Sequence, residues 1–158
     1  MSLAGLERLL EGSESFARAL NYADRDAEFT ISESLRPALL AALMHRKRES
    51  GGLGPLLLIA ATSREADSLR AAIASIMPEA QTVEFPAWET LPHERLSPSA
   101  ETVGRRAIVL HTLREHDGTR PLVIVASVRA ALQPVSPHAA HADPIVLRAG
   151  EESLGLDS

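Results

Sequence analysis

Apolar residues along this chain occur in two patterns, short uninterrupted runs and helical spacing, and the two patterns alternate. The segments 55–61 (PLLLIAA) and 121–127 (PLVIVAS) are almost entirely apolar, which predicts strands that are buried on both faces. A shorter strand is expected at 82–85. The resulting strand–helix–strand–helix–strand order is typical of an α/β fold, in which helices flank a central, mainly parallel sheet.

Two segments with capping-box spacing, TISE at 30–33 and TSRE at 62–65, predict the starts of helices. Pro37 falls inside the first helix, so we expect it in the first turn, with the regular helix beginning at Leu35. The second helix is expected to run to about residue 76. Its inward face is predicted to hold four apolar residues, namely Ala66, Leu69, Ile73 and Ile76.

A third helix is expected after Ser97 and Pro98, which suit the N-cap and the first helical position. This helix is predicted to run to about His116. Its inward side is expected to hold Val103, Ala107, Leu110 and Leu113. A short helix at 128–132 follows the last apolar run.

The order of these elements divides the chain into four parts. Residues 1–27 are expected to form N-terminal helices, and residues 28–132 the α/β domain. Residues 133–144 contain three prolines and are interpreted as a linker. The strand expected at 145–147 has no partner of its own, so residues 145–158 are interpreted as the start of a second subdomain, and the chain as a fragment.

Composition limits the functions that remain open. Of 158 residues, 45% are apolar and 23% charged, which suits a compact domain. The formal net charge of −5 argues against attraction of the whole surface to nucleic acid, although it allows a local basic patch. The absence of cysteine excludes disulfides and thiolate metal sites. With no apolar run near the roughly 20 residues of a membrane span and no signal-peptide pattern, we expect a cytoplasmic protein without membrane contact.

A phosphate-binding loop is the first motif to seek in an α/β domain, because its glycines bring backbone N–H groups to phosphate and its lysine adds charge. The sequence has no glycine between Gly12 and Gly51, and its only lysine, Lys47, falls near the end of a predicted helix. The G-x-G-x-x-G pattern of dinucleotide sites is also missing. We therefore expect no nucleotide hydrolysis and no bound cofactor.

Metal and nucleophile patterns are incomplete. His93 and Glu94 begin an H-E-x-x-H pattern, but Ser97 stands at the second histidine position. Two histidines and an aspartate within 138–143 are interpreted as linker residues, because nothing orients them as ligands. We predict no catalytic, cofactor-binding or metal-binding residue.

Basic residues gather in two places. The cluster at 45–48 falls at a predicted helix end, where positive charge is favourable. Arg105 and Arg106 fall one turn into a predicted helix beside Glu101, and we interpret them as exposed i,i+4 pairing residues and as weak contact candidates. Trp88, the only tryptophan, is interpreted as a packing anchor.

The segment 85–106, FPAWETLPHERLSPSAETVGRR, is too specific for a spacer. Together with PLLLIAATSREADSLRAAI before it and PLVIVASVRAALQPV after it, it resembles the N-terminal module of bacterial transcription-repair coupling factors, the Mfd family. The resemblance covers roughly residues 28–150. The residues of its signature are Trp88, Glu89, Leu91, Pro92, Glu94, Ser97 and Pro98.

That module in turn is similar to the first domain of the excision-repair protein UvrB. The segment FTISESLRPALLAAL, residues 29–43, occupies the place of the UvrB Walker A loop, but its glycines and lysine are gone. The resemblance therefore implies the scaffold of a nucleotide-binding domain without its phosphate chemistry. The segment after Phe85 is also too short for the damage-probing hairpin of UvrB.

The resemblance implies a large parent protein, an ATP-dependent DNA translocase of the helicase class that displaces RNA polymerase stalled at DNA damage. The parent recruits UvrA for nucleotide excision repair, mainly through the second subdomain. ATP and magnesium are expected only in its motor, outside this chain. The present chain is then a non-catalytic scaffold that contacts other domains of the parent. In this scaffold the loop at 85–98 would act as a clamp, with Trp88, Leu91 and Leu96 packed over strand ends.

Two alternatives stay open. A small-ligand domain would have a pocket beyond the carboxyl ends of its strands, lined by convergent polar groups. A DNA-binding module would present a cluster of Arg105, Arg106 and Arg129, with binding that weakens steeply as salt is added.

Overall fold

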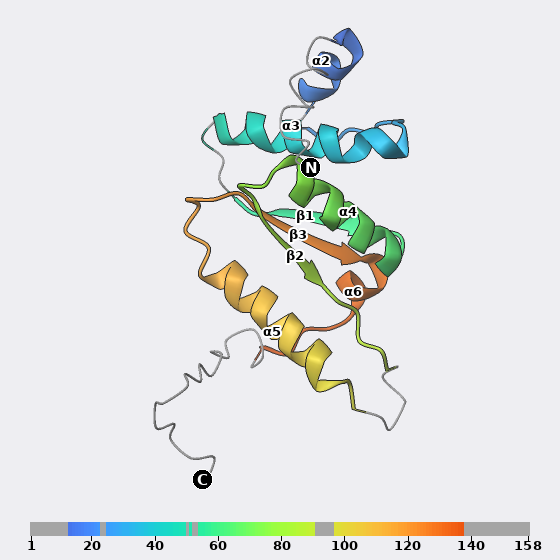
Figure 1. Cartoon of the computed structure of the whole chain (residues 1–158), viewed down its shortest axis with the longest axis vertical. Coiled ribbons are helices and arrows are strands. Elements are labelled where there is room, and N and C mark those ends of the chain that lie inside the picture. The colour runs from blue at the N-terminus through green and yellow to red at the C-terminus, as the bar shows by residue number, and fades with distance from the viewer. Residues whose placement is uncertain (1–12, 23–24, 50, 52–53, 91–96, 138–158) are drawn as a thin grey trace.

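The structure is a computed structural model that describes residues 13–22, 25–49, 51, 54–90 and 97–137. It confirms the α/β fold, with a parallel sheet between helices (Figure 1). The described elements are α2 (Glu14–Leu20), a 3-10 turn η1 (Glu33–Leu35), α3 (Arg36–Glu49), β1 (Leu56–Ala60), α4 (Ser63–Ile76), β2 (Gln81–Phe85), α5 (Ala100–Arg114), β3 (Leu122–Ser127) and α6 (Val128–Leu132).

The described strands lie in the order β1-β3-β2, and both pairings are parallel. All six residues of the central strand β3 are buried, as predicted for 121–127. The same prediction is wrong for β1, where Leu57 is 55% and Ile59 54% exposed. The reason is position, since β1 lies at an edge of the sheet and only its other face, with Leu58 and Ala60, joins the core.

Each face of the sheet is covered by a cluster of buried side chains. On one face, α3 and α4 pack against the strands, and the buried residues include Ala41, Ala66, Ile73 and Val125. On the other face α5 covers β2 and β3, and Val109 packs with Leu122, Ile124, Val83 and Phe85. The residues expected on the inward face of α4 are confirmed, because Ala66, Ile73 and Ile76 are buried and Leu69 packs against them.

Helix α2 packs on α3, on the side away from the sheet (Figure 1). Phe16 and Leu20 form a cluster with Leu39 and Ala42. The helices predicted for residues 1–27 are thus present in part, and positions 1–12 lie outside the described residues.

The two predicted capping boxes have different outcomes. The hydroxyl of Thr62 accepts a hydrogen bond from the N–H of Glu65 at 3.1 Å, so the start of α4 is confirmed. Thr30 does not cap α3. The turn η1 precedes that helix, and the residue at the cap of η1, Ser32, makes no capping bond. Pro37 is the second residue of α3, within the first turn as predicted.

The prediction for α5 was wrong at its start and on its inward face. Ser99, not Ser97, is the N-cap, and its hydroxyl accepts from the N–H of Thr102. The buried residues of the helix are Thr102, Arg106 and Val109. Val103 and Leu113, which were expected to face inward, are exposed. Polar contacts with the segment after β2 determine which face of α5 is buried. The spacing of apolar residues along the helix gives no sign of these contacts.

Several predicted features lie outside the described residues. They are the signature residues Leu91, Pro92 and Glu94, the other loop residues His93 and Leu96, and the positions from 138 onward with their histidines and the expected strand at 145–147. Within the described part of the chain, no helix has the length and apolar character required to cross a membrane.

Candidate functional site

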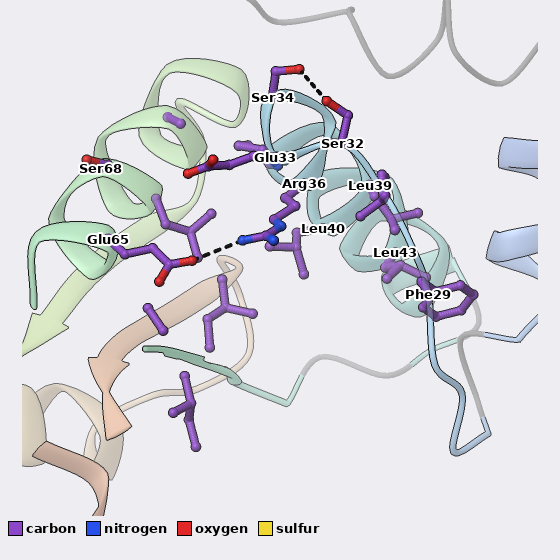
Figure 2. A pocket seen from close by; sticks show the side chains of 17 residues that line it. Phe29, Ser32, Glu33, Ser34, Arg36, Leu39, Leu40, Leu43, Glu65 and Ser68 are labelled. Atoms are coloured by element: carbon purple, nitrogen blue, oxygen red, sulfur yellow. Dashed lines mark hydrogen bonds and ion pairs between the residues drawn. The ribbon is translucent and has the colours of Figure 1, made fainter. Parts of the chain in front are cut away.

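A cavity of about 860 Å³ lies between α3 and α4, at the carboxyl end of β1 (Figure 2). Its wall is mainly apolar, and the apolar lining residues are Phe29, Ile31, Pro37, Leu39, Leu40, Leu43, Leu58, Ile59, Ala60, Leu69 and Ala72. Six residues of the segment 29–36 line it, and they belong to the segment expected to replace a Walker A loop. The cavity therefore lies where a nucleotide would be sought in an α/β domain.

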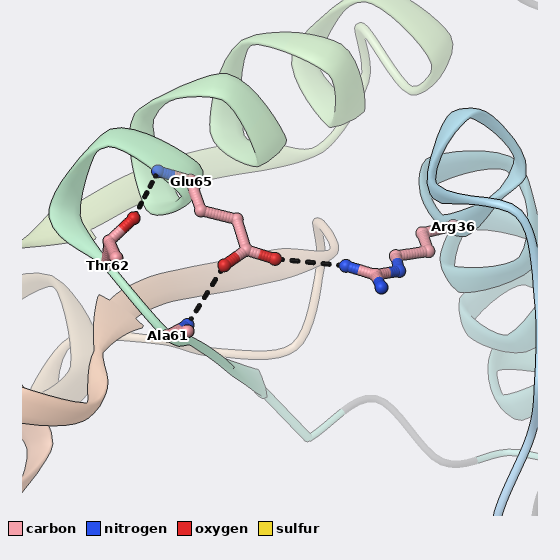
Figure 3. Close-up of polar contacts among 4 residues, drawn as sticks. All are labelled: Arg36, Ala61, Thr62 and Glu65. Carbon is pink, nitrogen blue, oxygen red and sulfur yellow. Dashed lines mark hydrogen bonds and ion pairs between the residues drawn. The ribbon is translucent and has the colours of Figure 1, made fainter.

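An ion pair spans this cavity from one helix to the other (Figure 3). The guanidinium of Arg36 lies 3.0 Å from one carboxylate oxygen of Glu65. The other oxygen accepts the backbone N–H of Ala61 at 3.1 Å. A phosphate-binding turn needs free backbone N–H groups and a cation. Here a carboxylate of the chain itself takes both an N–H group and the cation.

The remaining polar groups offer little chemistry. The hydroxyls of Ser32 and Ser34 lie 3.1 Å apart and bond to each other. Their hydrogen bond is to each other and not to a general base, so it does not activate either hydroxyl as a nucleophile. Among the described residues, no group of three or more histidines, aspartates and glutamates is placed to hold a metal ion.

A second site is formed by the signature loop, where Arg106 is held between two aromatic rings. Its guanidinium carbon lies 4.0 Å from the ring centre of Phe85 and 4.2 Å from that of Trp88. One terminal nitrogen donates to the carbonyl of Pro86 at 2.7 Å. The residue is only 3% exposed, and burial lowers the pKa of Arg106, although a guanidinium stays charged. The interpretation of Arg106 as an exposed pairing residue was therefore wrong.

Further hydrogen bonds hold the backbone of the signature loop in place. The N–H of Trp88 donates to the side-chain oxygen of Gln133 at 2.6 Å, and the amide nitrogen of Gln133 donates back to the Trp88 carbonyl at 3.4 Å. Arg129 donates to the carbonyl of Glu89 at 3.3 Å. The segment after β2 is thus tied both to α5 and to the end of α6.

The carboxylate of Glu89 joins the loop to the start of α5. It accepts hydrogen bonds from the hydroxyl of Ser99, at 2.6 Å, and from that of Thr102. These bonds to the charged form lower the pKa of Glu89 to about 2, with Ser99 the larger cause. Glu89 therefore helps to hold Ser99, the residue that caps α5.

Arg105 also differs from its prediction. It pairs with Glu84 of β2 rather than with Glu101. Burial raises the pKa of Glu84, and the neighbouring Arg105 opposes that rise. The pair joins α5 to the sheet, so both arginines proposed as contact candidates have partners within the domain.

Sequence reasoning found some of these residues and missed others. Of the signature residues, Trp88 and Glu89 are at the centre of the loop contacts, whereas Ser97 and Pro98 precede α5 without capping it. The Arg36–Glu65 pair was missed because its members are 29 positions apart. Arg106 was misread because a charged side chain normally marks the exposed side of a helix.

The fold and these two sites define an α/β domain without a phosphate cradle among its described residues. Over 156 residues the chain is 38% identical to proteins named transcription-repair-coupling factor from Mycobacterium bovis and Mycobacterium tuberculosis. The match covers 96% of this chain, which spans about 12% of the length of these relatives. The resemblance to the N-terminal module of coupling factors is thereby confirmed. No family model matches the chain.

Proposed function

We propose that the chain is the non-catalytic, UvrB-like scaffold module of a transcription-repair coupling factor. The observation that carries the proposal is the ion pair of Arg36 and Glu65, in which a carboxylate of the chain occupies a cation and the N–H of Ala61. The identity to two coupling factors over 96% of the chain supports it. The module would hold neighbouring parts of a longer protein in position, without a chemical step of its own.

The longer protein would translocate on DNA and displace RNA polymerase stalled at a lesion. Its motor, with ATP and magnesium, would lie outside this chain. In this proposal residues 28–132 are the UvrB-like domain, residues 133–144 a linker, and residues 145–158 the start of the subdomain that recruits UvrA. The contacts of the signature loop would keep the end of α6, and with it the linker, in a fixed position.

The two alternatives have less support. A DNA-binding role needs free arginines, but Arg105 pairs with Glu84, Arg106 is buried, and Arg129 donates to the Glu89 carbonyl. A small-ligand role is favoured by the size of the cavity between α3 and α4, which falls in the range of ligand pockets. Four of its polar lining residues, however, bond to one another, Ser32 to Ser34 and Arg36 to Glu65.

One titration series tests the proposal against both alternatives. The 158-residue chain is titrated with ATP and magnesium, with duplex DNA at two salt concentrations, and with UvrA. We expect no saturable ATP binding, little DNA binding at either salt concentration, and weak UvrA binding that increases when the sequence after 158 is added. Saturable ATP binding that is lost in Arg36→Ala would overturn the proposal.

A further inference from the structure

The outward face of α5 is apolar, whereas its inward face holds a charged residue. Arg106 is buried against the sheet, but Val103 is 45% and Ile108 57% exposed. A surface helix normally has the reverse arrangement, with its charged residues toward solvent. At about 3.6 residues per turn, the residues on the side opposite to the buried ones are Ala100, Val103, Gly104, Ala107, Ile108 and His111. None of these six is an acid, a lysine or an arginine.

Gly104 lies at the centre of this outward face, and no contact within the described part of the chain requires a glycine there. Glycine in a helix interior is destabilising relative to alanine. The φ angle of Gly104 is not positive, so an ordinary side chain fits the backbone. Outside its own helix backbone and chain neighbours, no atom lies within 4 Å of the position that a Cβ atom would take. The space above Gly104 is therefore open for a second backbone to approach.

We infer that the outward face of α5, residues 100–111, is a docking surface for an apolar helix that crosses α5 at Gly104. The small side chains on this face allow two helix axes to approach to about 8 Å, and Val103 and Ile108 flank the contact on either side. A helix is the occupant that fits, because it satisfies its own backbone N–H and C=O groups. A loop packed on an apolar face would leave such groups unpaired.

The docking helix belongs to a later part of the same polypeptide, an assignment that rests on the proposed function. The last described element, α6, ends beside the start of α5, because Gln133 bonds to both backbone groups of Trp88. The residue after Trp88, Glu89, accepts a hydrogen bond from Ser99, the N-cap of α5. The polypeptide thus leaves the sheet next to the docking surface. The matched region is only 12% of the length of the relatives, so a coupling factor has most of its sequence available to supply the helix.

Thiol labelling tests the inference directly. The sequence has no cysteine, so Ile108→Cys introduces the only thiol of the 158-residue chain. Its rate of alkylation is measured in this chain and in a polypeptide that continues the sequence to the length of its relatives, with mass spectrometry to assign the modified site. The thiol is expected to react rapidly in the short chain and about 100-fold more slowly in the long one. Arg64→Cys, at an exposed position of α4 across the sheet from α5, is the control and should react equally in both.

Gly104→Leu provides a second readout with opposite signs in the two polypeptides. In the short chain the leucine enters open space and favours the helix, so the Tm should rise by about 2–5 °C, which also shows that the variant folds. In the long polypeptide the same side chain holds the docking helix away from α5. A long variant that carries both Gly104→Leu and Ile108→Cys should therefore regain the rapid alkylation of the short chain.

Other outcomes overturn the inference. Slow alkylation in a monomeric 158-residue chain would show that residues of this chain cover the face. Slow alkylation that appears together with dimers of the short chain would assign the face to a second copy. Rapid alkylation in both polypeptides would leave the face uncovered, and protection that survives Gly104→Leu would refute a crossing at Gly104. None of these results bears on ATP binding, so the proposed function would be judged separately by its titrations.

Discussion

Arg106 lies against Trp88, with its guanidinium carbon 4.2 Å from the ring centre, and the two residues join the middle of α5 to the segment after β2. The contact buries a cation that has no carboxylate partner among the described residues, and one of its terminal nitrogens makes no hydrogen bond there. Such a group is retained only if its other contacts offset the cost of removing it from water.

The first prediction tests this balance. Arg106→Met should destabilise the domain by about 1–3 kcal/mol, because a charged hydrogen bond to Pro86 and two cation–ring contacts are lost while some desolvation cost is recovered. Urea unfolding followed by the fluorescence of Trp88 measures the change. Arg64→Met, at an exposed position of α4, is the control and should change stability by less than about 0.5 kcal/mol. Unchanged stability of Arg106→Met would contradict the prediction and would mean that the recovered desolvation cost fully offsets the lost contacts.

The second prediction concerns the loss of stability of the folded domain at low pH. The pKa of Glu89 in the folded state, about 2, lies below that of an unfolded glutamate, about 4.3. Its contribution to stability is therefore complete above the unfolded pKa and is lost as the pH falls toward 2. Glu89→Gln should lower stability at pH 7 and flatten the decline of stability between pH 4.5 and 2. Urea midpoints at several pH values provide the test, and an equally steep decline in the variant would contradict it.

The third prediction separates two neighbouring serines. Ser99→Ala should cost about 1–2 kcal/mol, because it removes the N-cap of α5 and one hydrogen bond to Glu89. Ser97→Ala should cost less than about 0.5 kcal/mol, since the residue is exposed and precedes the cap. Thermal and urea unfolding of the two variants measure these changes in stability. A larger loss of stability for Ser97→Ala than for Ser99→Ala would indicate that Ser97 is the N-cap, as the sequence alone suggested.

The fourth prediction is a double-mutant cycle on Arg36 and Glu65. Both side chains are partly exposed, so their coupling energy should be about 0.2–1 kcal/mol. Glu65→Ala alone should cost more than Arg36→Ala, because it also leaves the N–H of Ala61 without its acceptor. Unfolding free energies of the two single variants and the double variant give the cycle. A coupling of zero would show that the pair adds nothing to the bond with Ala61.

Local signals explain what could be predicted from the sequence. The start of α4 was readable because Thr62 and Glu65 are three residues apart and interact directly. The burial of β3 followed from an unbroken apolar run. The run in β1 is equally apolar, and only the order of the strands makes Leu57 and Ile59 exposed.

Contacts between distant segments explain what could not be predicted. The inward face of α5 depends on Arg106, whose partners Phe85, Pro86 and Trp88 precede it by about 20 positions. A helical pattern that counts arginine as polar rotates the helix so that Val103 faces inward. The cavity, likewise, appears only when α3 and α4 are placed on either side of β1.

The order β1-β3-β2 has a consequence for synthesis on the ribosome. Of the three described strands, the one translated last, β3, lies between the other two, which do not touch each other's hydrogen-bonding edges. No part of this sheet can therefore assemble until Leu122–Ser127 has left the exit tunnel. A nascent chain that ends earlier displays the apolar strand β1 without its partner, and we expect such a product to depend on chaperones for its solubility.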